Sequence, residues 1–246
     1  MTRIKDVYAW LDGVAPFDTA EEWDNSGLQL GDPEAEVERA LLCLDVDAGA
    51  LERAEAMDAQ LVISHHPLLF HPIKTLSQGF EAELLCRMVR GGRGLIAAHT
   101  NLDKARGGVN ECLLRSLGVE PSGQDGFVFA GELEGEPSAG AFLELVRERL
   151  NEQAWFFGDR EAKLRRLAVC SGGGGDFFQE AHRLGAQAFL TGEMAHHNLL
   201  RARALGLQLF VAGHAQTENV VLSPLAKRLS RKLGICAEIY PYVAIQ

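Results

Sequence analysis

The stretch ALLCLDVDAGALERAEAMDAQLVISHHP, at residues 40–67, decides the fold. Residues 40–46 and 61–64 are mostly apolar runs of strand length, and residues 48–58 between them are expected to form a helix. Because the connections are short, the three segments predict a βαβ unit with parallel strands and a right-handed crossover. The second strand leads directly into His65, His66 and Pro67, which places two imidazoles at its carboxyl end.

The same alternation of strands and helices continues along the chain. Further strands are expected at 95–98, 127–133, 164–170, 188–191, 207–212 and 236–243. Further helices are expected at 2–11, 80–90, 109–117, 138–150, 176–184, 196–205 and 220–233, with a polar loop at 20–28. Residues 164–218 follow the pattern of residues 40–66, since strands in both segments end in imidazole or carboxylate side chains.

This pattern predicts an α/β fold of two similar α/β lobes, whose mostly parallel sheets face a shared metal-binding cleft. We expect lobe 1 at residues 1–118. Residues 119–246 are assigned to a crossover, at about 119–163, and to lobe 2 after it. The two lobes together are expected to form one compact unit.

Composition and charge argue against several classes of protein. The 246 residues are 47% hydrophobic and 24% charged, which is typical of a soluble globular chain. The formal net charge of −10 argues against a surface that binds nucleic acid throughout. A local basic patch stays open as an alternative to solvated helix faces. Its candidates are Arg147, Arg149, Lys163, Arg165 and Arg166, or Arg201 and Arg203.

Targeting signals and cysteine usage favour a cytoplasmic protein. No apolar run approaches the roughly 18 residues that a membrane helix needs. The first residues, Met1 to Tyr8, have no signal-peptide core. The five cysteines contain no C-x-x-C pair, so we expect buried thiols in a reducing compartment and no zinc ligation by cysteine.

Side chains of the metal-binding type follow three separate apolar strands. His65 and His66 close the first, Asp103 comes five residues after the second, and His214 and Glu218 follow the third. If a helix starts near Gly213, His214 and Glu218 lie on one face, about one turn apart. Structural histidines, and Asp103 as a helix cap near Gly108, are the alternatives.

This set of nitrogen and oxygen donors suits Zn, Fe, Mn or Ni. Five ligands are more than one catalytic zinc uses, so the count predicts two divalent metal ions per subunit in a dinuclear centre. Two such ions would lower the pKa of a bridging water and polarise a carbonyl, imine or phosphoryl group. The chemistry that the sequence predicts is therefore hydrolysis.

Other polar residues near strand ends are candidates for proton transfer or for orienting the ligands. These are His99, Glu193 and His197, with His196 beside them; exposed loop residues are the alternative reading. The run from Ser171 to Gly175 is interpreted as a tight turn, and an anion cradle stays open as the second interpretation.

Six short motifs resemble one protein family over nearly the whole chain. They are EWDNSGL at 22–28, SHHPLLF at 64–70, AHTNLD at 98–103, GGVN at 107–110, TGE at 191–193, and GH at 213–214 with Glu218. The family is that of the GTP cyclohydrolase 1 type 2 homologues, the YbgI-like proteins. Relatives often carry Gly-His-Tyr-x-x-Glu in the last motif, where this chain has Ala215 and Gln216 in the middle.

The resemblance implies a two-lobed α/β protein with a dinuclear metal site, assembled as a toroidal homohexamer. It implies that His65, His66, Asp103, His214 and Glu218 are the ligands, and that this chain is the short form without an inserted domain. We found no residues that specify guanine or a triphosphate.

Three functions are compatible with the sequence. The first is a metal-dependent hydrolase that acts through metal-bound hydroxide on a small, nucleotide-like substrate, by a GTP cyclohydrolase-like reaction or by hydrolysis of a damaged or modified nucleotide. The second is a non-catalytic, metal-binding, ring-shaped scaffold for a protein or nucleic-acid partner; the charge mildly disfavours nucleic acid, and no membrane partner is expected. The third is a structural α/β protein with no metal.

Overall fold

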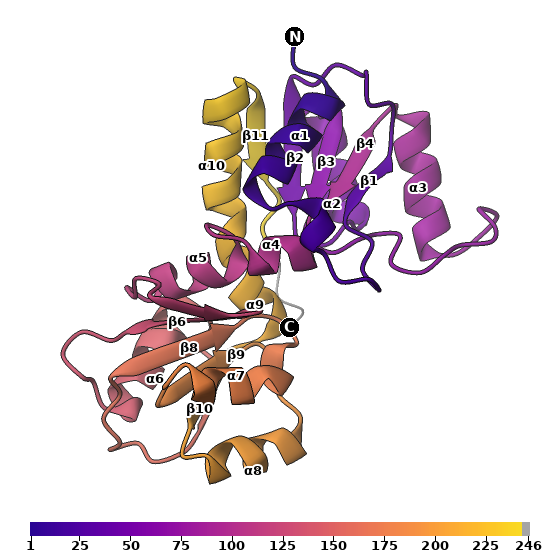
Figure 1. Ribbon diagram of the computed structural model, residues 1–246. Helices are drawn as coiled ribbons and strands as arrows, with labels where there is room; N and C mark the ends of the chain where they lie inside the picture. Colours follow the sequence, from indigo (N-terminus) through magenta and orange to yellow (C-terminus); the bar gives the residue numbers. More distant parts are fainter. Residues whose placement is uncertain (243–246) are drawn as a thin grey trace. The chain divides into compact units, whose positions relative to one another are not determined.

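The computed structural model describes residues 1–242 and divides the chain into two compact units. Unit 1 comprises the described residues of Met1–Ala105 and Leu222–Gln246, and unit 2 comprises Arg106–Val221. Each unit is built from one mixed β-sheet and its helices, as the α/β prediction required (Figure 1).

The division differs from the predicted boundary at residue 118, because the chain returns to unit 1 at its C-terminal end. Strand β11 (Cys236–Ile239) pairs in parallel with β2 (Arg39–Cys43), from Cys236 opposite Arg39 to Ile239 opposite Leu42. This pairing joins segments almost 200 residues apart, and no local pattern announces it. Val243, the last residue of the strand predicted at 236–243, lies outside the described residues.

The sheet of unit 1 has the strand order β1-β4-β3-β2-β11. The predicted βαβ unit is present as β2, α2 (Ala48–Ala56) and β3 (Leu61–Ser64), with Ala40 opposite Leu61. Strand β4 (Gly94–Ala97) extends the parallel ladder, and all residues of β3 and β4 are buried. Near-continuous apolar runs are typical of parallel strands that are covered on both faces.

The remaining elements of unit 1 are the first edge strand of this sheet and further helical segments. They are α1 (Ile4–Val14), the 3₁₀ turn η1 (Phe17–Thr19), β1 (Gly27–Leu30), α3 (Phe80–Arg90), α4 (Thr100–Lys104) and α10 (Leu222–Leu233). Helix α1 buries Ile4, Val7 and Leu11 at helical spacing, and α10 packs on β2 and β11. Leu51 of α2 and Met88 of α3 share one apolar cluster with the strands.

The sheet of unit 2 has the order β5-β6-β8-β9-β10-β7. Its centre is parallel and consists of β8 (Arg166–Cys170), β9 (Ala188–Thr191) and β10 (Gln208–Val211). Strands β5 (Gly123–Asp125), β6 (Val128–Glu132) and β7 (Trp155–Phe157) pair antiparallel at its sides. Both units therefore place three sequential strands in a parallel run, which is the similarity expected from the sequence.

Helices lie against both faces of the second sheet. They are α5 (Val109–Ser116), α6 (Ala139–Arg149), α7 (Phe178–Arg183), α8 (His196–Ala204) and α9 (His214–Glu218), with 3₁₀ turns η2 (Gly174–Phe177) and η3 (Asn219–Val221). Two adjacent residues of β9 lie on opposite faces of the sheet. Phe189 packs with α7 and α8, and Leu190 packs with α5 and α6. Because side chains alternate across a strand, one apolar strand contributes to the hydrophobic clusters on both faces of the sheet.

Several elements differ from the sequence prediction. Strand β1 lies partly within the predicted loop at 20–28 and pairs antiparallel with β4, with a register shift between Leu28 and Leu30. Strands β5 and β7 were not predicted, because three residues are too short for a periodic signal. The helix predicted at 176–184 is divided between η2 and α7, and the helix predicted at 220–233 begins at Leu222.

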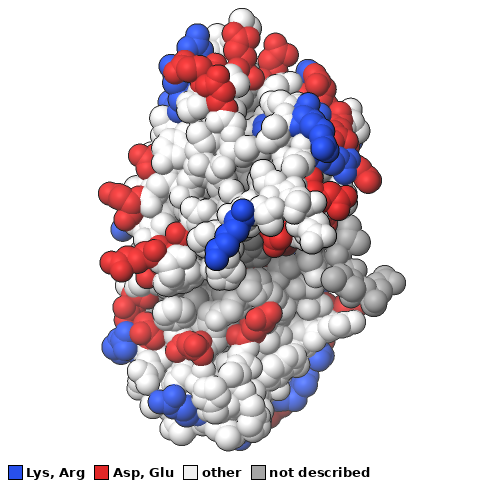
Figure 2. All heavy atoms as spheres, turned by 90° about the vertical axis from the view of Figure 1, so that its right-hand side faces the viewer, with Lys and Arg blue, Asp and Glu red and all other residues white. Residues whose placement is uncertain are grey.

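Surface charge agrees with the composition. Figure 2 shows acidic side chains spread over one face, with basic side chains in small separate groups. Two of the basic residues that were considered as an alternative patch are paired with acids: Arg147 with Glu144, and Arg166 with Glu132. Among residues 1–242, no helix has the length and apolar character to span a membrane. The thiols of Cys43, Cys112 and Cys170 are buried, whereas Cys236 is exposed, contrary to expectation.

Candidate metal centre

Three parallel strands of unit 1 end at the same edge of their sheet and place the histidines there. The ladder continues past β3, since the amide of His65 donates to Cys43 O at 3.0 Å and that of His66 to Leu44 O at 2.9 Å. The amide of Ala98 donates to Ser64 O at 2.9 Å, which brings His99 to the same edge. Ligand sites of open α/β sheets are found at this edge.

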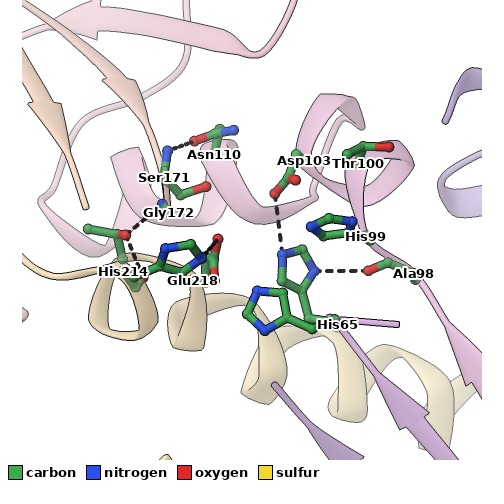
Figure 3. A network of polar contacts seen from close by, with 12 residues as sticks. His65, Ala98, His99, Thr100, Asp103, Asn110, Ser171, Gly172, His214 and Glu218 are labelled. Carbon is green, nitrogen blue, oxygen red and sulfur yellow. Dashed lines mark hydrogen bonds and ion pairs between the residues drawn. The ribbon is translucent and has the colours of Figure 1, made fainter. Parts of the chain in front are cut away.

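The ring of His65 is buried and held in one orientation. Its Nδ1 lies 2.9 Å from Ala98 O (Figure 3). A carbonyl oxygen only accepts, so Nδ1 carries the proton and Nε2 carries the lone pair that a metal requires. Asp103 Oδ1 lies 3.6 Å from His65 Nε2.

His66 has the same arrangement with a carboxylate. Its Nδ1 lies 2.8 Å from Asp45 Oδ1, and Asp45 stands two residues after the end of β2. An ionised carboxylate accepts only, so this contact also assigns the lone pair to Nε2. Histidine ligands of metals characteristically donate their second nitrogen to a carboxylate or carbonyl in this way.

His99 is oriented by Asp24, whose side chain is fully enclosed. His99 Nδ1 lies 2.8 Å from Asp24 Oδ1. Asp24 also accepts from Ser26 Oγ at 2.8 Å and from the Thr100 amide at 3.1 Å. Burial is the largest influence and raises the pKa of Asp24, but the hydrogen bonds from His99, Thr100 and Ser26 outweigh it and hold the pKa well below its ordinary value.

The three imidazoles converge. One ring nitrogen of each of His65, His66 and His99 lies within 4.8 Å of the others, close enough to hold one metal ion. Their ring centroids are 4.9 to 5.5 Å apart. Since all three have Nδ1 next to an oxygen acceptor, Nε2 carries the lone pair in each, and an imidazole set suits Zn, Fe, Ni or Cu.

Asp103 lies beside this group, at His65, and does not cap the following helix. It lies inside α4, which follows β4 immediately, and is buried. The N-cap of α5 is Gly108, which makes no side-chain capping bond. The helix-cap interpretation of Asp103 is therefore wrong, and its carboxylate lies beside His65 instead.

Unit 2 contains a second set of imidazole and carboxylate groups, in α9. His214 Nε2 lies 3.3 Å from Glu218 Oε1, one turn along the helix as the spacing predicted (Figure 3). His214 Nδ1 lies 3.3 Å from Glu193 Oε1. The side chain of Glu218 is buried, whereas Glu193 is exposed.

The glycine run of unit 2 brings backbone close to these ligands. At Gly172, φ is +55°, and a Cβ would come to 2.0 Å from Glu218 Oε1 and 3.1 Å from His214 Nε2. The Gly172 amide donates to Thr217 Oγ1 at 3.0 Å, and the Ser171 amide to Asn110 Oδ1 at 2.7 Å. Because these two amides already donate to side chains of the protein, they favour the tight-turn interpretation over an anion cradle.

The remaining predicted residues differ in their surroundings. His99 is at the ligand group of unit 1, and Glu193 contacts His214 in unit 2. His196 and His197 are exposed at the start of α8, and within residues 1–242 the structure gives His197 no ion pair with the ligand groups. Asp24 and Asp45 received no role from the sequence; Asp45 falls inside the strand predicted at 40–46, whereas β2 ends at Cys43.

Together, the fold and the two sets of ligand-type side chains define an α/β protein with candidate metal sites at its strand ends. A family model described as Duf34/NIF3 (NGG1p interacting factor 3) matches residues 2–241. The chain belongs to this family, which confirms the resemblance found in the six motifs.

Individual relatives align over most of their length. A Campylobacter jejuni protein named GTP cyclohydrolase 1 type 2 homolog is 32% identical over 230 residues, covering 92% of each chain. A Helicobacter pylori protein named GTP cyclohydrolase 1 type 2 is 30% identical over 226 residues, covering 89% of this chain and 88% of that protein.

Solved structures agree on the fold. The Staphylococcus aureus hypothetical protein SA1388 superimposes with a TM-score of 0.89 at 25% identity, covering 98% of this chain and 96% of that one. Reduced HcgD from Methanocaldococcus jannaschii superimposes with a TM-score of 0.85 at 27% identity, covering 98% of each chain.

Proposed function

We propose that this protein is a metal-dependent hydrolase that acts on a small, nucleotide-like substrate. The observation that carries the proposal is the shared orientation of His65, His66 and His99, each with Nδ1 against an oxygen acceptor and with one ring nitrogen in a common cluster. The three imidazoles can present their lone pairs to one place only if each ring is held in this orientation.

The proposed ligands of two divalent ions are the five predicted residues, His65, His66, Asp103, His214 and Glu218. When bound, such ions activate water and polarise the bond to be hydrolysed. The side chains fit this use, because the imidazoles of unit 1 have fixed tautomers. In unit 2, Gly172 leaves the space beside Glu218 and His214 that a Cβ would fill.

His99 and Asp24 are suited to moving a proton. His99 is not among the five proposed ligands, so its Nε2 lone pair would accept the proton from the attacking water, and the Asp24 carboxylate on Nδ1 would stabilise the imidazolium that results. Glu193 Oε1 is a second proton acceptor, next to His214. His197 stays a candidate for proton transfer at the exposed start of α8.

The names of the relatives support a purine nucleotide as substrate, with ring opening as one version of the reaction and hydrolysis of a modified nucleotide as another. We also propose a homohexamer, from the family resemblance. The test is turnover of a nucleotide panel that includes GTP by metal-loaded protein. His65→Ala and His214→Ala should abolish turnover, whereas His182→Ala, at an exposed position of α7, should not.

Two outcomes would contradict this function. If the protein binds metal but turns over no nucleotide of the panel, the scaffold is the better account. If His65→Ala and His214→Ala retain full turnover, the proposed ligands have no part in the reaction.

A further inference from the structure

Two large aromatic side chains of unit 1 are exposed beside His99. Trp23 is 60% exposed and Phe70 is 39% exposed. Their ring centroids lie 6.0 Å apart, and each lies close to the imidazole of His99, at 6.2 and 6.3 Å. Exposing this much apolar surface next to a polar site costs free energy, so it calls for a functional explanation.

The two aromatic residues stand on loops that are tied together. The side-chain amide of Asn25 donates to Leu69 O at 2.6 Å, and the Leu69 amide donates to Gln29 Oε1 at 3.1 Å. Asp24, next to Trp23, is enclosed and hydrogen-bonded to His99. The backbone under both rings is therefore fixed before any ligand arrives, which lowers the entropic cost of binding on them.

We infer that Trp23 and Phe70 form a ring-stacking subsite for the planar heteroaromatic part of the substrate, of the size of a purine base. The planes of the two rings meet at 58°, so a flat ligand stacks on one ring and meets the other at an angle. This inference rests on the proposed function, since it places the substrate ring beside the histidines of unit 1.

The subsite also explains how a chain without a guanine-specific motif can bind a nucleotide. Stacking on Trp or Phe needs only a π-face, and it tolerates different bases. Selection among bases would then fall to other contacts, whereas Trp23 and Phe70 set the requirement for a flat ring. They are positioning residues, and the proton transfer stays with His99.

The experiment compares three probes on metal-loaded protein: guanosine, GTP and inorganic triphosphate. Trp23→Ala should weaken binding of guanosine and GTP about tenfold, as loss of one stacking contact predicts. It should leave binding of triphosphate and the metal count unchanged. Trp23→Phe should restore most of the affinity. Trp155→Ala, which removes another exposed tryptophan in β7, is the matched control and should bind all probes normally.

Equal guanosine affinity of Trp23→Ala and wild type would overturn the subsite. A changed sedimentation coefficient of Trp23→Ala, with unchanged guanosine binding, would instead identify the surface as a contact between copies of the chain. Guanosine binding is also measured on metal-free protein. If Trp23→Ala binds guanosine as wild type does, both without metal and with it, stacking is refuted. If wild type binds no metal but Trp23→Ala still weakens guanosine binding, the proposed function alone is refuted.

Discussion

Asp24 Oδ1 lies 2.8 Å from Nδ1 of His99, although the two residues are 75 positions apart in the chain. The side chain of Asp24 is fully enclosed, and it also accepts hydrogen bonds from Asn25, Ser26 and Thr100. The contact fixes the His99 ring and links the EWDNSGL motif to the AHTNLD motif. Asp24 thus connects the loop that carries Trp23 with the candidate metal centre.

Asp24→Asn should reduce both stability and turnover. The amide would present a donor where Ser26 and Thr100 also donate, so we expect a loss of about 1–3 kcal/mol in the free energy of unfolding. With His99 no longer held by a carboxylate, kcat should fall about 100-fold or more. Thermal denaturation and steady-state kinetics measure the two effects. Asp18→Asn, at an exposed position of η1, is the control; an equal loss in both variants would refute the role of Asp24.

Gly172→Ala should disturb the ligand set of unit 2. The Cβ would come to 2.0 Å from Glu218 Oε1, and φ is +55°. Gly185→Ala is a matched control, because φ is +74° there and no atom lies within 4 Å of the added Cβ. Both variants carry the backbone strain of about 1–2 kcal/mol. A greater loss of stability and a weaker metal affinity are expected for Gly172→Ala alone, and equal behaviour in denaturation and metal titration would contradict this.

Asp45→Asn should weaken metal binding without removing a ligand. Loss of a carboxylate that orients a histidine ligand typically lowers metal affinity about 10- to 100-fold. His66→Ala should have the larger effect on affinity. Asp58→Asn removes a carboxylate from a surface ion pair with Arg39 and should bind metal as wild type does. Competition titration with a chelator measures all three variants, and an unchanged affinity of Asp45→Asn would show that Asp45 does not orient His66.

Chelation should lower the thermal stability of metal-loaded protein. An ion that binds the native state alone stabilises it by about 2.7 kcal/mol at 100 times its dissociation constant. The melting temperature should therefore fall on addition of chelator and recover with added metal. The double variant His65→Ala/His214→Ala should melt at one temperature with or without chelator. A chelator effect of wild-type size in that variant would place the stabilising metal elsewhere.

The elements that sequence predicts best are the apolar ones. Strands β3 and β9 and helix α3 have the predicted bounds, because their apolar residues follow strand or helix periodicity. The short edge strands β5 and β7 carry no such signal, since their place depends on pairing with β6 and β10. Strand β11 was predicted, but its pairing with β2, which moves the division between the units, joins distant segments and has no local signal.

The candidate site likewise has residues that local sequence predicts and residues that it does not. Histidines at strand ends can be found from local sequence, because a strand and its end are adjacent in the chain. Asp24 and Asp45 escape that reasoning, since their contacts with His99 and His66 depend on the pairing of distant segments. Trp23 and Phe70 lie in motifs that the sequence analysis quoted, but their exposure is a property of the folded loops.

Elemental analysis of the purified protein, with a count of ions per chain, tests the central claim most directly. Wild-type protein should hold about two divalent ions per chain, as a dinuclear centre requires. His65→Ala and His214→Ala should each hold fewer, and His182→Ala should hold the wild-type number. Wild-type protein without bound metal after loading with Zn, Fe, Mn or Ni, or an unchanged count in His65→Ala and His214→Ala, would contradict the account.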